Sequence, residues 1–503
     1  MTTPKKPLAA CIAVFGTGSD VGKSIVTTAV CRYFYRLGLK VAPFKAQNMS
    51  NNSGVTAEGL EMGRAQIVQA EAAGVPPHVD MNPVLLKPTS DVGSQVVVLG
   101  KALENNTAAE YHVKKANHFK VATEALDRLR RTHDVVIIEG AGSCAEVNLM
   151  AHDIVNFSIA EYADAPVILV ADIHRGGVFA QIIGTLACLP RPLADRIKGF
   201  IVNRFRGDLR LFKDGVDYLE DKTGKPVLGV LPWFDHVRIQ DEDSVVLEKI
   251  RPRKNEGAHL AKIAVVRLPH ISNFTDFDPL FGLDGVDAFF TESPADISGC
   301  AGIIIPGSKN TRADLGWLFD KNWAGAIRSY ANNGGAVLGI CGGYQMLGTV
   351  LHDPEGFEGR PGSSEGLGLL PVSTVMKHPK TTTLSRFTWD GREGTGYEIH
   401  MGQTTRHGGQ SLFHVHERKH ERCDDEDGCV SDEANVLGTY MHGLFDSPEI
   451  LKAILFRMGL GRIAVPEKGG LAAREREYDR LLDHVAAHVD LHTIQGYITD
   501  EKH

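Results

Sequence analysis

The feature that most constrains this chain is an alternation of short, continuously apolar segments with amphipathic helical stretches, which occurs twice along its 503 residues. The first series runs from about residue 8 to 250, and the second runs from 262 to 450. Apolar strands without a polar face must be covered on both sides, so intervening helices predict parallel sheets. We therefore expect an α/β fold with two doubly wound, mostly parallel-sheet domains.

The predicted domain boundaries follow from changes in composition along the chain. The first domain is expected at residues 1–250 and the second at 262–450, with a polar, charged linker at 251–261. Residues 451–503 are charged and helical in pattern, which predicts a C-terminal helical tail. Residues 353–433 are richer in glycine, threonine, histidine and acidic residues, and we expect shorter, partly antiparallel strands there.

Composition excludes several classes of protein. Hydrophobic residues make up 43% and charged residues 23%, as in ordinary globular proteins. No apolar run reaches the roughly 20 residues of a membrane helix, and the first residues do not resemble a signal peptide. The formal charge of 54 − 62 = −8 argues against nucleic-acid binding. Eight scattered cysteines show no disulfide framework, which predicts a reducing cytoplasm.

A glycine-rich loop at residues 16–24 (GTGSDVGKS) joins a predicted strand to a predicted helix, the context that a phosphate-binding loop requires. Its backbone N–H groups and the helix N-terminus favour an anion. One departure is Thr17, where the strict pattern has glycine; the alternative interpretation is a turn with a chance Gly-Lys-Ser. The predicted ATP contacts in the loop are Thr17, Gly18, Asp20, Gly22, Lys23 and Ser24.

A magnesium site is predicted beside this loop. The Ser24 hydroxyl is one expected ligand, and a carboxylate at the end of another parallel strand is expected to be the second. Glu139 ends the apolar segment 134–139, and Asp172 ends the segment 166–172. The carboxyl ends of parallel strands face the ligand crevice, although either carboxylate could instead cap a helix.

An amide-rich segment at residues 45–53 (KAQNMSNNS) follows the second predicted strand. Amide side chains donate and accept hydrogen bonds without adding negative charge, which suits a substrate that carries many carboxylates and carboxamides. Asparagine and serine also favour polar turns, which is the alternative interpretation. The predicted substrate contacts are Lys45, Gln47, Asn48 and Asn51.

A candidate nucleophile, Cys341, stands between a predicted strand and a predicted helix in the segment 336–345 (AVLGICGGYQ). Such a turn exposes the side chain, and the helix N-terminus favours the thiolate. The N–H of Gly342 is a predicted oxyanion donor, with a second donor from Gly307 or Ser308. Without this context, a buried structural cysteine is the usual interpretation.

His442 is the predicted base for this thiol. Of the 21 histidines we single it out because it follows a late predicted strand, as Cys341 follows an earlier one. A surface or capping histidine is the alternative. The cysteines at 423 and 429 enclose several carboxylates and are interpreted as part of a solvated acidic loop, not as a metal or redox pair.

The first series resembles the dethiobiotin synthetase and cobyrinate synthetase group of P-loop enzymes, through Thr17 with residues 21–24 (VGKS) and residues 139–142 (EGAG). That resemblance implies ATP-dependent activation of a carboxylate, with adenine contacts from Asn203 and its neighbour Arg204. Residues 45–53 resemble the corresponding segment of the cobyric acid synthase family.

The segment 339–345 (GICGGYQ) resembles the nucleophile motif of class I glutamine amidotransferases. The resemblance implies that Cys341 attacks the side-chain amide of L-glutamine and releases ammonia. Most members of that class carry a glutamate two residues after the catalytic histidine, where this chain has Leu444. A Cys–His dyad is therefore the simpler prediction, with Glu398 as a weaker candidate for the group that orients His442.

Together the two resemblances imply an ATP-dependent, glutamine-hydrolysing amide ligase of the cobyric acid synthase family. The implied corrinoid substrate is adenosylcobyrinic acid a,c-diamide, amidated at its b, d, e and g side chains with ATP and Mg²⁺. Alternatives are an a,c-diamide-forming synthase, a partition-type P-loop ATPase with an inactive glutaminase-like domain, and a regulatory binding protein. The order of amidation and the oligomeric state are left open by the sequence.

Overall fold

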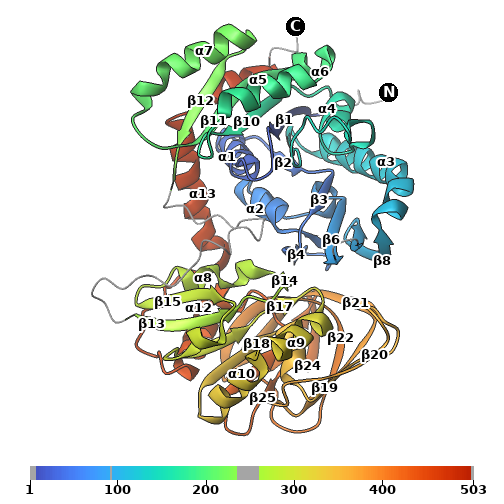
Figure 1. Cartoon of the computed structure of the whole chain (residues 1–503), viewed down its shortest axis with the longest axis vertical. Helices are drawn as coiled ribbons and strands as arrows, with labels where there is room; N and C mark the ends of the chain where they lie inside the picture. Colours follow the sequence, from blue (N-terminus) through green and yellow to red (C-terminus); the bar gives the residue numbers. More distant parts are fainter. Residues whose placement is uncertain (1–6, 91–92, 235–259, 500–503) are drawn as a thin grey trace.

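The computed structural model describes residues 7–90, 93–234 and 260–499, and it confirms the α/β prediction. The chain forms two lobes, drawn in blue to green and in yellow to orange (Figure 1). The first lobe contains a six-stranded parallel sheet with the order β12-β11-β10-β1-β9-β2. Its strands are β1 (Ala10–Gly16), β2 (Val41–Phe44), β9 (Val135–Glu139), β10 (Val167–Asp172), β11 (Ile197–Phe205) and β12 (Val227–Pro232).

Helices cover both faces of this sheet because its strands are apolar on both sides. One hydrophobic cluster joins β1 to α1 (Lys23–Arg36), and a second joins the opposite face to α3 (Ala108–Thr132) and α5 (Val178–Cys188). The remaining helices of this lobe are α2 (Arg64–Ala72), α4 (Phe157–Ala163), α6 (Arg191–Arg196) and α7 (Lys213–Thr223). Strand order reverses beside β1, which places a ligand crevice at its carboxyl end.

A smaller mixed sheet lies at the edge of the first lobe that faces the second, and the sequence analysis did not predict it (Figure 1). Its strands are β3 (Gln47–Met49), β6 (Val84–Ser90), β7 (Gly93–Val98) and β8 (Lys101–Thr107), beside a two-stranded pair of β4 (Ser53–Val55) and β5 (Glu61–Gly63). β3, β4 and β5 contain three residues each, too few to show a periodicity, and polar residues interrupt β6 and β8.

The second lobe has its own six-stranded sheet, ordered β15-β13-β16-β18-β26-β25, parallel except at the β25 edge. The strands are β13 (Ala261–Val266), β15 (Val286–Thr291), β16 (Gly302–Ile305), β18 (Ala336–Ile340), β25 (Cys429–Val430) and β26 (Val436–Thr439). The helices are α8 (Asp278–Phe281), α9 (Thr311–Asp320), α10 (Trp323–Asn332), α11 (Gly342–Leu347) and α12 (Pro448–Arg457).

Residues 350–427 form a further mixed sheet, with a long hairpin where shorter strands were expected. The hairpin pairs β21 (Val372–Trp389) with β22 (Arg392–Arg406), which contain 18 and 15 residues. The prediction of shorter strands was wrong for this hairpin, because polar residues alternate along its half-buried strands and so resemble loop composition. The other strands are β19 (Val350–Asp353), β20 (Gly362–Glu365), β23 (Phe413–Arg418) and β24 (Glu421–Asp427).

The C-terminal helices α13 (Gly470–Ala486) and α14 (Leu491–Thr499) return to the first lobe, where α13 runs along its side in red (Figure 1). Leu481 and Ile494 are buried in the same cluster as strand β1. The predicted helical tail therefore completes the core of the first lobe through α13 and α14, whereas its first residues, 451–457, belong to α12 of the second lobe. The predicted linker at 251–261 lies outside the described residues except for its last two positions. No helix in the described ranges is both long and apolar enough to span a membrane.

Candidate active sites

The glycine-rich loop curls at the carboxyl end of β1. Asp20 and Gly22 have φ angles of 56° and 100°, and a Cβ on Gly22 would lie 2.0 Å from the Asn203 amide nitrogen. Glycine is therefore required at position 22. The Lys23 ammonium donates to the carbonyl oxygens of Gly18 at 2.8 Å and Gly142 at 3.0 Å. These two hydrogen bonds hold the Lys23 ammonium over the loop, where phosphate oxygens would bind.

The Glu139 carboxylate is surrounded by polar side chains beside the glycine-rich loop. The Ser24 hydroxyl donates to its Oε1 at 2.9 Å, and the Lys45 ammonium contacts the same oxygen at 3.0 Å. The Gln69 amide donates to the other carboxylate oxygen, and Glu139 is fully buried. A hydroxyl oxygen and a carboxylate oxygen side by side are hard donors of the kind that Mg²⁺ prefers, so the residues fit the predicted metal.

Asp172 lies in a different environment. Its Oδ2 accepts a hydrogen bond from Arg204 at 2.9 Å, and its Oδ1 accepts from the backbone N–H of His174 at 2.7 Å. Arg204 also pairs with Asp20 at 2.8 Å. Asp172 does not line the cavity beside the loop, so of the two carboxylates the geometry favours Glu139.

A cavity of about 530 Å³ opens beside the loop. The sequence-predicted residues that line it are Asp20, Gly22, Lys23, Ser24, Lys45, Gln47, Asn48, Glu139 and Arg204. Thr17, Gly18, Asn51 and Asn203 are not part of the lining. Thr17 donates to Gln181 at 3.2 Å, and the Asn203 amide donates to the carbonyl of Val21 at 2.9 Å. Asn203 therefore braces the loop in this structure.

Cys341 occupies a strained turn between β18 and α11. Its φ and ψ angles are 53° and −109°, a conformation that non-glycine residues rarely adopt. A Cβ on Gly343 would lie 2.0 Å from the carbonyl oxygen of Ile305, so the turn packs directly against β16. The Cys341 thiol contacts the carbonyl of Ile399 at 3.6 Å and lines a cavity. This is the geometry of a nucleophile elbow.

The backbone of the turn 307–308 lies against the elbow. A Cβ on Gly342 would lie 2.8 Å from the backbone nitrogen of Ser308, and a Cβ on Gly307 would lie 3.1 Å from Cε1 of His442. The Ser308 hydroxyl donates to Asp314 at 2.6 Å, which fixes the turn. The three backbone positions predicted to stabilise an oxyanion are thus brought together beside the histidine.

His442 is fully buried, and its Nδ1 lies 2.6 Å from Oδ2 of Asp276. The other Asp276 oxygen accepts from the Gly443 N–H and the Tyr397 hydroxyl, each at 3.2 Å. Burial lowers the pKa of His442, but attraction to Asp276 and Cys341 outweighs burial and raises that pKa to about 10. The arrangement favours an imidazolium beside the Cys341 sulfur.

The structure places a carboxylate beside the predicted Cys–His pair. Asp276 fills the place of the missing glutamate, whereas the Glu398 carboxylate contacts Ser385, His400 and Arg418. Sequence reasoning missed Asp276 because it lies in a short 3-10 helix (Phe274–Phe277) between β14 (Ile271–Ser272) and α8, far from both motifs. One signal in the sequence could have identified Asp276. It follows β13, the first strand of the second lobe, and so lies near the carboxyl edge of the same sheet at which Cys341 follows β18.

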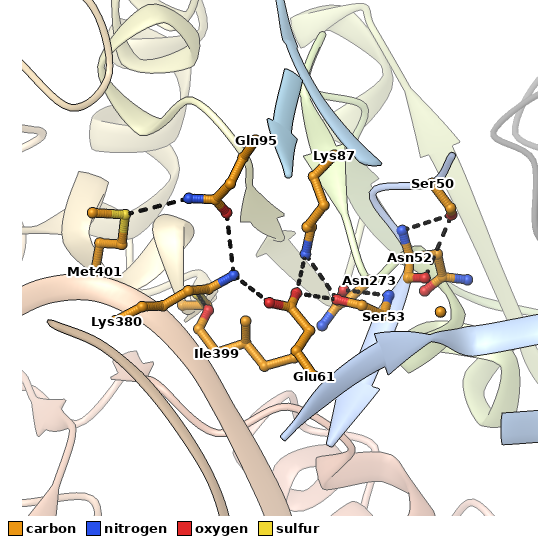
Figure 2. A network of polar contacts seen from close by, with 12 residues as sticks. Ser50, Asn52, Ser53, Glu61, Lys87, Gln95, Asn273, Lys380, Ile399 and Met401 are labelled. Atoms are coloured by element: carbon orange, nitrogen blue, oxygen red, sulfur yellow. Dashed lines mark hydrogen bonds and ion pairs between the residues drawn. The ribbon is translucent and has the colours of Figure 1, made fainter. Parts of the chain in front are cut away.

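The amide-rich segment of the first lobe contacts the loop that carries Asp276. The backbone N–H of Ser53 donates to the Asn273 side chain at 3.2 Å (Figure 2). The Thr275 hydroxyl donates to the Asn52 side chain at 3.1 Å. The predicted substrate segment and the histidine's partner are therefore linked directly across the two lobes.

An ion network joins the lobes beside the thiol. Glu61 and Lys87 of the first lobe meet Lys380 of the second, and each ammonium lies 2.6 Å from a Glu61 oxygen (Figure 2). Burial alone raises the pKa of Glu61, but Lys380 and Lys87 outweigh burial and hold that pKa well below its usual range. The carboxylate is thus charged, fully buried and shared between the lobes.

We expect Glu61→Gln to lower the free energy of unfolding by about 3 kcal/mol, because it leaves two buried ammonium groups without their carboxylate. Urea unfolding measures this loss. The control is Glu161→Gln, which changes an exposed side chain of the partly buried helix α4 and should alter the free energy of unfolding by less than about 0.5 kcal/mol. A loss as small as that of the control would show that the network does not hold the lobes together.

A phosphate-loop domain joined to a domain with a cysteine elbow and a Cys–His–Asp cluster defines a class: nucleotide-binding ligases fused to a glutamine amidotransferase. Residues 12–246 match the model of the CobQ/CobB/MinD/ParA nucleotide binding domain. Residues 262–450 match the model of the CobB/CobQ-like glutamine amidotransferase domain.

Full-length relatives narrow this class. The chain is 48% identical to a cobyric acid synthase of Chlorobium phaeobacteroides over 96% of both chains. It is 48% identical to that of Chlorobaculum tepidum, over 95% of this chain and 96% of the relative. It is 46% identical to that of Chloroflexus aurantiacus with the same coverage. The chain belongs to the cobyric acid synthase family of ligases, which carry a glutamine amidotransferase domain and act in cobalamin biosynthesis.

Proposed function

We propose that this chain converts adenosylcobyrinic acid a,c-diamide to adenosylcobyric acid, by amidating the b, d, e and g carboxylates with ammonia from glutamine. The observation that carries the proposal is the cavity of about 200 Å³ beside the Cys341 thiol. Its walls include His442 of the second lobe together with Lys87 and Gln95 of the first. Ammonia formed in this cavity is therefore released next to the nucleotide-binding lobe.

In the second lobe, the Cys341 sulfur attacks the carboxamide carbon of glutamine, and His442 gives a proton to the departing ammonia. Water then cleaves the thioester and releases glutamate. Asp276 holds the imidazole in orientation and stabilises its charged form, as the third member of a nucleophile triad does. The N–H groups of Gly342, Gly307 and Ser308 are the proposed donors to the oxyanion.

In the first lobe, a corrinoid carboxylate accepts the γ-phosphoryl group of ATP, ADP leaves, and ammonia displaces phosphate from the acyl phosphate. Lys23 and the loop backbone bind the phosphates, and Gln47 and Asn48 bind the corrinoid's amide and carboxylate groups. Ser24 and Glu139 would hold Mg²⁺, which would neutralise phosphate charge. Activation is needed because a free carboxylate resists attack by ammonia.

Mass spectrometry of the corrinoid after incubation with the enzyme, ATP, Mg²⁺ and glutamine tests this proposal. Each amidation replaces OH with NH₂, which lowers the mass by one countable step, and we expect four steps from the a,c-diamide. Omission of ATP is the control and should give none. Amidation of cobyrinic acid that stops at two steps would instead identify an a,c-diamide-forming synthase.

A further inference from the structure

Four charged side chains line the thiol cavity, and two of them are used neither by the proposed chemistry nor by the ion network between the lobes. Of the charged residues that line it, Lys87 and Lys380 are both engaged by Glu61 (Figure 2). Lys309 and Glu358 also line the cavity. Within the described ranges, neither forms an ion pair, with the other or with any third residue.

The backbone at both positions is fixed. Lys309 directly follows the turn at Gly307 and Ser308, and its N–H donates to the carbonyl of His270 at 2.9 Å. The loop before Glu358 is held by Asp353, whose carboxylate accepts three successive backbone N–H groups, each at 2.9 Å. The two side chains are thus presented from rigid supports, which lowers the entropic cost of binding a ligand.

The electrostatics of the pair favour a ligand that carries both charges. Burial, with the nearby ammonium groups of Lys380 and Lys87, lowers the pKa of Lys309 to about 7. Burial also raises the pKa of Glu358, although its Oε2 accepts the backbone N–H of Arg312 at 3.0 Å. Each group is therefore costly to charge in the empty cavity, and a carboxylate beside Lys309 and an ammonium beside Glu358 would offset that cost.

We propose that Lys309 and Glu358 form a zwitterion subsite that binds the α-carboxylate and the α-ammonium group of free glutamine. The inference rests on the proposed function, because it requires the glutamine carboxamide to lie at Cys341. The cavity of about 200 Å³ is below the roughly 300–1,000 Å³ of drug-sized ligand sites, as a free amino acid requires. The subsite makes the cavity selective for the free amino acid, because a glutamine within a peptide lacks both charges.

Two glutamine analogues, each lacking one charge, test the subsite in the full-length enzyme. Glutaramate lacks the α-amino group and 4-aminobutanamide lacks the α-carboxylate, and ammonia release gives kcat/KM for each. We expect Lys309→Met to lower kcat/KM for glutamine about 10- to 100-fold through KM, as expected for a lost charge-assisted hydrogen bond. The same variant should leave 4-aminobutanamide unaffected, and Lys309→Arg should restore most of the preference for glutamine.

Glu358→Gln should show the reciprocal pattern, with a loss for glutamine and none for glutaramate. The matched control is Lys377→Met, which removes an exposed lysine of β21 and should behave as wild type with all three compounds. Equal losses on all three compounds in the Lys309 and Glu358 variants would overturn the subsite. If the wild-type enzyme released no ammonia from glutamine, the proposed function itself would fail, so the two failures are distinguishable.

Discussion

Cys341→Ser is expected to lower glutamine-dependent amidation by about a million-fold, the scale seen when a catalytic nucleophile is removed. A serine hydroxyl does not ionise beside His442 as a thiol does, so thioester formation stops. Amidation supported by ammonium salt should continue at the wild-type rate, because the nucleotide-binding lobe is intact. The assay follows corrinoid mass with each nitrogen source.

The control for this variant is Cys188→Ser, which changes an exposed cysteine of the first lobe and should leave both activities unchanged. Loss of the ammonia-supported reaction in the Cys341 variant would contradict a division of labour between the lobes. Persistence of the glutamine-supported reaction would show that another group is the nucleophile. The second result would also contradict the zwitterion subsite, which requires the glutamine carboxamide to lie at Cys341.

The sequence was informative where chemistry is encoded in a contiguous motif at a strand end. The loop at residues 16–24 and the elbow at Cys341 are of this kind, because glycines and a following helix fix the local backbone whatever the rest of the fold does. The α/β prediction succeeded for the same reason, since apolar strands and helices alternate within each lobe. The roles assigned to the motif residues remain predictions.

The rest depended on contacts between distant segments. Asp276 reaches His442 across 166 positions of sequence, and no local pattern marks it. Asp172 looked equivalent to Glu139 at a strand end, but Arg204 pairs with it and removes it from the cavity lining. Likewise, α13 has an amphipathic pattern that predicts a helix without saying which lobe it covers. Such pairings depend on tertiary charge complementarity, which residue spacing does not encode.

Asp276→Asn is expected to lower glutamine hydrolysis by about 1,000-fold, because an amide neither fixes the imidazole tautomer nor stabilises its charge. Asp276 helps to raise the pKa of His442 to about 10, so its removal lowers that pKa. Since the proton leaves the imidazole at a lower pH, the alkaline limb of the kcat profile should move toward neutrality. Asp284→Asn, an exposed neighbour on the same lobe, is the control and should keep the wild-type profile. An unshifted alkaline limb in Asp276→Asn would favour the simpler Cys–His dyad. A shifted limb, with ammonia-supported amidation intact, would establish Asp276 as the positioning residue of a triad.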